Sequence, residues 1–163
     1  MKKIKYIAQI QYILNDNIQF EDEKNRRRDL MLKRNEIGTL LLRIVLGLVF
    51  LANGVAKFQG GIGNTAGWFE SIGIPGFLAY AVGTIELVGG IALILGLGTR
   101  IVSLLLGIIM IGAIFTVNLP AGFLNGYVLD LVLLVVAVHL VLNGSKLYSL
   151  GQLMFKGREA KNS

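Results

Sequence analysis

Residues 77–119 read FLAYAVGTIELVGGIALILGLGTRIVSLLLGIIMIGAIFTVNL, two apolar runs on either side of a glycine-rich turn at Gly96 to Thr99. Each run is about 20 residues long, the length of helix that crosses the ~30 Å hydrocarbon core of a bilayer. One acidic residue, Glu86, interrupts the first run, and Arg100 follows the turn. This stretch predicts two membrane-spanning helices, 77–97 and 101–119, joined by a short turn.

Two further apolar segments, 39–58 and 127–142, lie outside this pair. The composition agrees with a membrane protein, because 54% of the residues are hydrophobic and the mean hydropathy is +0.66. Soluble domains of this length seldom reach such values. Short connections make neighbouring helices antiparallel. We therefore predict an all-α fold, an integral membrane antiparallel four-helix bundle over residues 39–143.

The basic residues predict the topology of this bundle. The net charge is +6, and Lys and Arg gather before the first span, at Arg100 and after the fourth span, whereas the loop 60–76 has none. By the positive-inside rule, residues 1–38 form a cytoplasmic basic extension and 144–163 a cytoplasmic basic tail. Both termini are then cytoplasmic. Beside a membrane span, such charge indicates contact with anionic lipid rather than with nucleic acid.

The N-terminal extension leaves two interpretations open. One is an amphipathic helix at the membrane surface, built around Ile4, Ile7, Ile10 and Leu14. The other is that Met31 is the natural start and that residues 1–30 are dispensable. The extension has no apolar core suited to a signal peptide.

Five ionisable side chains lie within the predicted spans or at their edges: Arg43, Lys57, Glu86, Asp130 and His139. A charge at the centre of a membrane helix costs about 2.5 to 3.5 kcal/mol on insertion scales, so such residues tend to face one another or a wet interior. Their depth follows from the 1.5 Å rise per residue and from the alternating direction of the spans. Lys57, Glu86 and Asp130 are predicted to form an outer candidate site, with Asn118 at the end of the third span as a polar neighbour. Arg43 marks an inner site with His139, and about 21 Å of helix separates Arg43 from Lys57.

A structural role competes with a functional one at each of these positions. Arg43 and Lys57 have stems long enough to reach the headgroups on their own sides of the bilayer. Glu86 is too deep and too short for that, which favours a partnered position inside the bundle. A single His139 is more often a hydrogen-bonded structural residue than a ligand, and it cannot supply bis-histidine haem ligation.

The first span also orders its residues by helical face. Arg43, Gly47, Phe50, Gly54 and Lys57 follow three- and four-residue steps and form one stripe. Small residues beside charged ones allow a neighbouring helix, or a flat ligand, to come close. The stripe is predicted to point into the bundle, with packing as its main role.

Several chemistries are excluded or poorly supported. The chain has no cysteine, so it supplies no disulfide, thiolate metal site or dithiol relay of its own. No cluster of metal-ligating residues is predicted, and any redox electrons must travel on something bound. Gly61, Gly63 and Ala66 match the spacing of a dinucleotide fingerprint, but no strand precedes them, and the motif has meaning only in a βαβ unit.

Over about 31–153 the sequence resembles the DoxX family of small four-span bacterial membrane proteins, and within it the CatD-like oxidoreductases of bacilli. The resemblance rests on the following strings: Arg43-x-x-x-Gly47-x-x-Phe50, Gly54-x-x-Lys57-Phe58, Gly73-Ile74-Pro75, Glu86-x-x-Gly89-Gly90, the turn from Gly96 to Arg100, Asn118-Leu119-Pro120-x-Gly122-Phe123, and Gly144 leading to Tyr148-Ser149-Leu150. The resemblance implies a multi-pass protein of the bacterial cell membrane.

The family is similar to a subunit of archaeal thiosulfate:quinone oxidoreductase, which implies a redox role. The cofactor stays open, and a quinone is one candidate. The sequence departs from the family at three points. Asn118 stands where many members have His, Asp130 where the last span usually has Glu, and Gly151 where Asp is common. These departures weaken the assignment of chemistry to those positions.

Two hypotheses of function follow. In the first, the chain is the membrane subunit of a quinone-linked oxidoreductase, in which Lys57, Glu86 and Asp130 hold the ring and pass protons while Arg43 fixes the cytoplasmic end. In the second, it is a non-catalytic membrane scaffold that anchors a soluble oxidoreductase or a stress-response partner. A solute carrier is less compatible with four spans in a monomer, and a homo-oligomer stays open.

Overall fold

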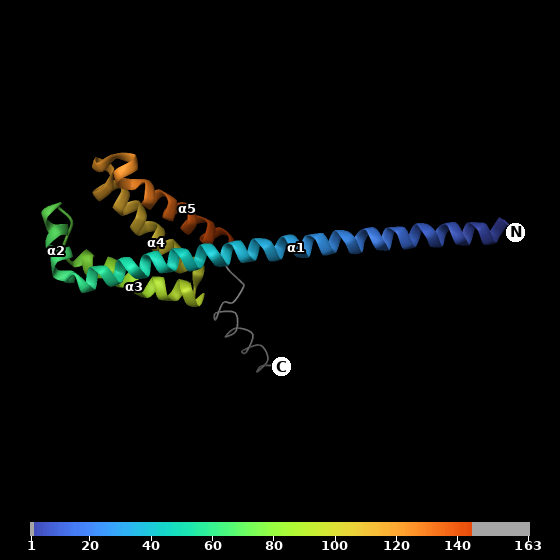
Figure 1. Ribbon diagram of the computed structural model, residues 1–163, viewed down its shortest axis with the longest axis horizontal. Helices are drawn as coiled ribbons and strands as arrows, with labels where there is room; N and C mark the ends of the chain where they lie inside the picture. Colours follow the sequence, from blue (N-terminus) through green and yellow to red (C-terminus); the bar gives the residue numbers. More distant parts are fainter. Residues whose placement is uncertain (1, 145–163) are drawn as a thin grey trace, which may run out of the picture. The chain divides into compact units, whose positions relative to one another are not determined.

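The computed structural model describes the backbone of residues 2–144 and the side chains from residue 15 onward. This part of the chain is helical and contains no strand. The elements are α1 Lys2–Gln59, α2 Ile62–Ser71, α3 Phe77–Leu95, α4 Thr99–Ala113, the short turns η1 Ile114–Asn118, η2 Leu119–Ala121 and η3 Phe123–Tyr127, and α5 Val128–Asn143 (Figure 1). The predicted basic tail over 145–163 and the predicted apolar face of residues 4–14 lie outside these limits.

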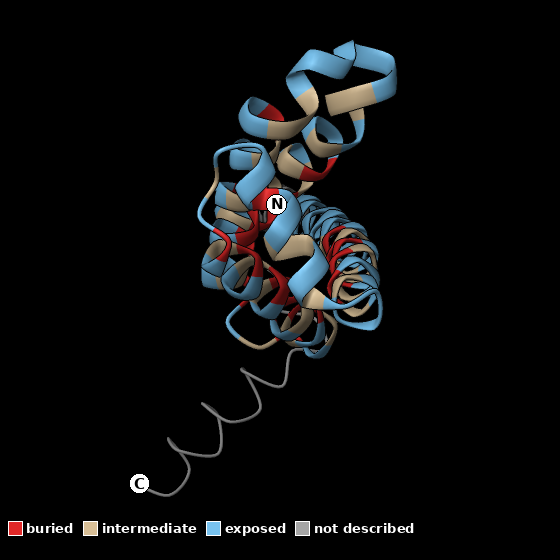
Figure 2. Ribbon diagram, turned by 90° about the vertical axis from the view of Figure 1, so that its left-hand side faces the viewer, coloured by how far each residue is buried: buried red, intermediate tan, exposed pale blue. Residues whose placement is uncertain are grey.

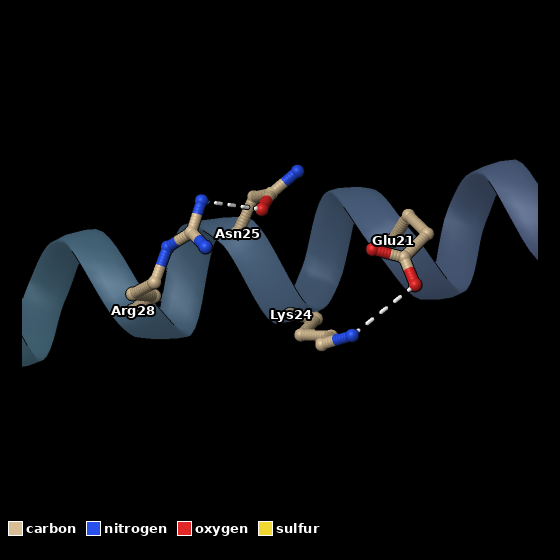
Figure 3. Close-up of polar contacts among 4 residues, drawn as sticks. All are labelled: Glu21, Lys24, Asn25 and Arg28. Carbon is tan, nitrogen blue, oxygen red and sulfur yellow. Dashed lines mark hydrogen bonds and ion pairs between the residues drawn. The ribbon is translucent and has the colours of Figure 1, made fainter.

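Two compact units divide the chain, Met1–Ile37 and Gly38–Ser163. In the first unit, the described side chains are almost all exposed, and its polar contacts join residues one turn apart on α1. Lys24 donates to Glu21 at 3.3 Å, and Arg28 donates to Asn25 at 2.9 Å (Figure 3). Exposed pairs of this kind contribute only a few tenths of a kcal/mol each, so they support the helix without fixing it against another element.

Within the described part of the chain, four helices are long and apolar enough to cross a membrane: Asn15–Gln59, Phe77–Leu95, Thr99–Ala121 and Phe123–Asn143. The chain reverses direction between them, and Figure 1 shows α1 beside α3 and α4 beside α5. The predicted all-α, antiparallel four-helix membrane bundle is confirmed. Most of the surface of these helices is exposed, and the buried residues form stripes along them (Figure 2), as expected for helices whose outer faces contact lipid.

Glycine brings the backbones of α1 and α3 together. A Cβ added at Gly54 would lie 2.6 Å from the backbone nitrogen of Leu87, and one added at Gly90 would lie 2.6 Å from that of Leu51. No larger side chain fits such a contact without separating the helices. The predicted stripe on α1 does point inward, since Arg43, Gly47, Phe50 and Gly54 are all buried.

The turn between α3 and α4 explains where both helices end. Gly96 and Gly98 have positive φ values, 73° and 54°, a conformation that glycine adopts without steric cost. The left-handed Gly96 caps α3 after Leu95, so the helix is two residues shorter than the predicted span 77–97. Arg100 then donates to the carbonyl of Leu142 at 3.5 Å, which places a cation at the C-terminal end of α5.

The hydrophobic core of the second unit lies among α1, α3, α4 and α5. Its buried members are Leu46, Phe50, Leu93, Leu106, Met110, Leu133, Ala137 and Leu140. Polar residues that lie within one or two turns of this core therefore occur in a dry environment, where unpaired groups are costly. α2 lies outside it and contributes the exposed Trp68 and the buried Phe69, an arrangement suited to a membrane interface.

Candidate functional site

An ion pair joins α1 and α3 inside the span. The Nζ atom of Lys57 donates to Oε2 of Glu86 at 2.5 Å. The Glu86 side chain is 5% exposed and that of Lys57 is 25% exposed. The carboxylate is therefore enclosed by protein, while part of the lysine side chain lies at the surface of the bundle.

Two glycines lie one turn before the two charged residues. Gly54, one turn before Lys57, packs on the backbone of Leu87 and so brings the two helices within reach of a single side chain. Gly83, one turn before Glu86, packs against the same end of α1 and against α2: a Cβ added there would lie 3.1 Å from Cδ1 of Ile62 and 3.4 Å from Cε2 of Phe58, but in ordinary contact, at 3.8 Å, with Cδ of Lys57. The close approach at Gly54 is therefore what brings the charged pair together.

Because the surroundings of the pair have a low dielectric constant, each charge depends on the other for its stability. A lone charge at this depth costs several kcal/mol, whereas an opposite charge in direct contact offsets much of the cost. Removing one partner of a buried pair leaves an uncompensated charge. Among the residues that the structure describes, Glu86 is the only buried carboxylate, so it is the one acid held inside the bundle.

Asp130 lies in a different contact. Asn118, at the end of η1, donates from Nδ2 to Oδ2 of Asp130 at 2.5 Å, and within the described part of the chain Asp130 makes no ion pair with Lys57 or with any other base. The contact joins the end of the third span to the first turn of α5. The structure therefore brings two of the three predicted outer residues together, Lys57 and Glu86, and places the third with Asn118.

The backbone around Asn118 departs from an α-helix. The π-helical turns Ile114–Asn118 and Phe123–Tyr127 flank the 3₁₀ turn Leu119–Ala121, and Gly122 between them has a φ of 80°. π turns are rare and are found often at functional sites. Here they set the orientation of Asn118 toward α5.

At the other end of the bundle, Arg43 is buried with an exposure of only 1%. Thr39, one turn earlier on α1, makes a hydrogen bond of 3.3 Å with Nε2 of His139 on α5. Asn143 approaches Nδ1 of the same ring at 3.2 Å and donates to the His139 carbonyl at 3.1 Å. An amide nitrogen can only donate, so Nδ1 accepts, and Nε2 carries the proton and donates to Thr39.

His139 takes the hydrogen-bonded position that the sequence favoured, whereas Arg43 is buried instead of reaching the headgroups. Arg43 does not lie at the surface of the bundle, and His139 ties α5 to α1 through Thr39. Sequence reasoning missed Thr39 and Asn143 because uncharged polar residues give no signal against an apolar background. The four-residue spacings from Thr39 to Arg43 and from His139 to Asn143 are the patterns that would have indicated them.

The described residues offer little for a metal. No group of three or more His, Cys, Asp or Glu side chains within residues 15–144 is arranged to hold one. The polar groups that could contact an organic ligand are the Lys57–Glu86 pair at one end and the Arg43 region at the other. Their chemistry is that of charge and hydrogen bonding.

These features define a small multi-pass membrane protein with an internal ion pair. The sequence profile of the DoxX family matches residues 38–119, and the chain belongs to that family. It is 46% identical to the "Putative oxidoreductase CatD" of Bacillus subtilis over 132 residues, which cover 81% of this chain and 98% of the relative.

Other relatives are more distant or match a shorter segment. The "Uncharacterized membrane protein Rv3486" of Mycobacterium tuberculosis is 41% identical over 92 residues, 53% of this chain and 56% of the relative. The "Inner membrane protein YqjF" of Escherichia coli is 35% identical over 74 residues, 45% of this chain and 56% of the relative. No solved structure matches the chain.

Proposed function

We propose that this protein is the membrane subunit of a quinone-linked oxidoreductase, and that Lys57 and Glu86 form its outer site. The observation that carries the proposal is the ion pair itself, in which the ammonium group of a partly exposed lysine lies 2.5 Å from the carboxylate of a buried glutamate. Ionisable residues inside membrane spans usually mark substrate or proton pathways. The relative in Bacillus subtilis carries an oxidoreductase name, which supports the same class of function.

The chemistry of the pair suits a quinone. The ammonium group of Lys57 donates a hydrogen bond to a quinone oxygen, and Glu86 takes up and releases protons beside it. Reduction of the quinone to the quinol takes two electrons and two protons. The electrons come from a redox-active soluble partner protein, because this chain has no cysteine of its own to supply them.

The remaining residues take supporting roles in this proposal. Asp130 holds the outer ends of the third and fourth spans together through Asn118, and Arg43 fixes the cytoplasmic end. The protein lies in the bacterial cell membrane with both termini in the cytoplasm, since the basic residues gather on that side.

Extraction of bound quinone tests the proposal. Wild-type protein is purified from native membranes with its lipid, and its bound quinone is compared with that of Glu86→Gln and of the control Asp130→Asn. We expect about one quinone per chain in the wild type and in the control, and a large loss in Glu86→Gln. Wild-type protein without bound quinone would refute the proposal.

A scaffold is the second candidate function. The observation that favours it is that three polar contacts of the spans join different helices: Lys57 with Glu86, Thr39 with His139, and Asn118 with Asp130. Buried pairs sometimes specify packing rather than perform chemistry. In that case Glu86→Gln lowers the yield of folded protein, but the activity of the partner per assembled complex is unchanged.

A further inference from the structure

Asn53 is a polar residue on an exposed face of α1 within the first span. Its side chain is exposed, and its neighbours Ala52 and Ala56 are exposed as well. Among the residues that the structure describes, none makes a hydrogen bond with the Asn53 amide. Other polar side chains of this half of the bundle have partners: Lys57 pairs with Glu86, Asn118 donates to Asp130 and Thr116 donates to the Gly112 carbonyl.

The depth of Asn53 makes this exposure costly. The residue lies ten positions after Arg43 and four before Lys57, which corresponds to about 15 Å and about 6 Å along the helix axis. In the predicted span 39–58, Asn53 lies about 8 Å along the axis from residue 58 and about 21 Å from residue 39, inside a hydrocarbon core of ~30 Å. The short amide side chain cannot reach the headgroups as a lysine does, and an amide without a partner in an apolar environment is unfavourable by a few kcal/mol.

The four-residue spacing between Asn53 and Lys57 places Asn53 next to the outer site. Residues four apart on a helix are neighbours on its surface, with Cβ atoms about 6 Å apart, so the Asn53 amide lies one turn below Lys57. Lys57 is itself partly exposed. The adjacent Ala52 and Ala56 have no side chains large enough to cover the amide. A ligand that moves within the bilayer can therefore reach both polar groups from the side.

We propose that Asn53 belongs to the outer site and hydrogen-bonds the oxygen of an apolar ring ligand that enters laterally from the bilayer. This inference rests on the proposed function and deepens it. An amide both donates and accepts hydrogen bonds, whereas an ammonium group only donates. Asn53 therefore serves the carbonyl of a quinone and the hydroxyl of a quinol equally, while Lys57 favours the carbonyl.

Equilibrium binding of decylubiquinone to the purified full-length protein in lipid nanodiscs tests the role of Asn53. We expect Asn53→Leu to weaken binding about tenfold, the effect of one lost hydrogen bond in a dry site, and Asn53→Gln to retain most of it. Thr116→Val is the matched control, because its exposed hydroxyl already bonds the Gly112 carbonyl at 2.7 Å. Leucine is a better helix former than asparagine, so Asn53→Leu is expected to fold.

The outcomes separate this inference from the proposed function. If the wild type binds and Glu86→Gln does not, but Asn53→Leu binds normally, only the role of Asn53 is overturned. If the wild type itself does not bind, both proposals fall. Because the chain has no other thiol, Asn53→Cys adds a direct check. If decylubiquinone protects this thiol from a maleimide, the inference is supported. If two copies form a disulfide through this thiol even when the quinone is present, a second copy covers Asn53 and the inference is overturned.

Discussion

Replacing Lys57 by methionine keeps the length of the side chain and removes its charge, and the structure predicts a large effect on stability. Glu86 is left behind with only 5% of its side chain exposed. Removing one partner of a buried pair typically costs 3 to 5 kcal/mol. Since a quarter of Lys57 is already exposed, we expect the lower end of that range, about 3 kcal/mol.

The reverse change, Glu86→Gln, is predicted to cost less. The remaining lysine is partly exposed, and its flexible stem can carry the ammonium group toward the nearer headgroups. We expect a loss of about 1 kcal/mol, close to that of one hydrogen bond. The double variant Lys57→Met with Glu86→Gln should be more stable than Lys57→Met alone, because it leaves no unpaired charge.

Equilibrium unfolding in mixed micelles measures these differences, with helical circular dichroism as the signal and with Trp68, the only tryptophan in the chain, as a fluorescent reporter. Equal losses in the two single variants would contradict the asymmetry derived from their exposure. A loss below about 0.5 kcal/mol for Lys57→Met would refute the argument that the pair is desolvated.

Two further predictions concern the packing of the bundle and use the same unfolding measurement. Gly54→Leu should destabilise the protein by about 3 kcal/mol, because a Cβ there meets backbone at 2.6 Å. Gly112→Leu, at a position with nothing within 4 Å, should be neutral or stabilising, and a similar loss in both would refute the close contact of α1 and α3. Thr39→Val and His139→Phe should each cost about 1 kcal/mol. The double variant should cost little more than either one, whereas simple addition would show that the two residues do not act as a pair.

The sequence predicted the fold because its signal is strong and local. Apolar runs of about 20 residues, separated by short turns, leave few arrangements other than a helical bundle in a membrane. The pairing of Lys57 with Glu86 was also accessible, since both residues lie at similar depth on stripes that contain glycine. The depth of the two residues and the helical faces that they occupy were together sufficient to predict this pair.

That Asp130 contacts Asn118 and makes no ion pair with Lys57 was not accessible in the same way. The depth argument assumes regular α-helices with a rise of 1.5 Å, and it gives no information on which direction a side chain takes around the helix axis. The π turn Ile114–Asn118 changes the orientation of Asn118 at the end of the third span. This local backbone, which no composition pattern indicates, sets the contact with Asp130.

The contacts of uncharged polar residues were also not predicted from the sequence. Thr39 and Asn143 contact His139 in the structure, and Asn53 lies exposed on a membrane-spanning helix. The hydropathy of a span does not tell which polar side chain meets which, so these contacts are known only when the neighbours in space are known.

The measurement that tests the central claim most directly is the rate of quinone reduction in native membrane complexes that contain equal amounts of wild-type or Glu86→Gln protein. If the Lys57–Glu86 pair handles the quinone and its protons, the rate per assembled complex falls at least tenfold in the variant. An unchanged rate per complex would contradict that role and would show that the pair only holds α1 and α3 together.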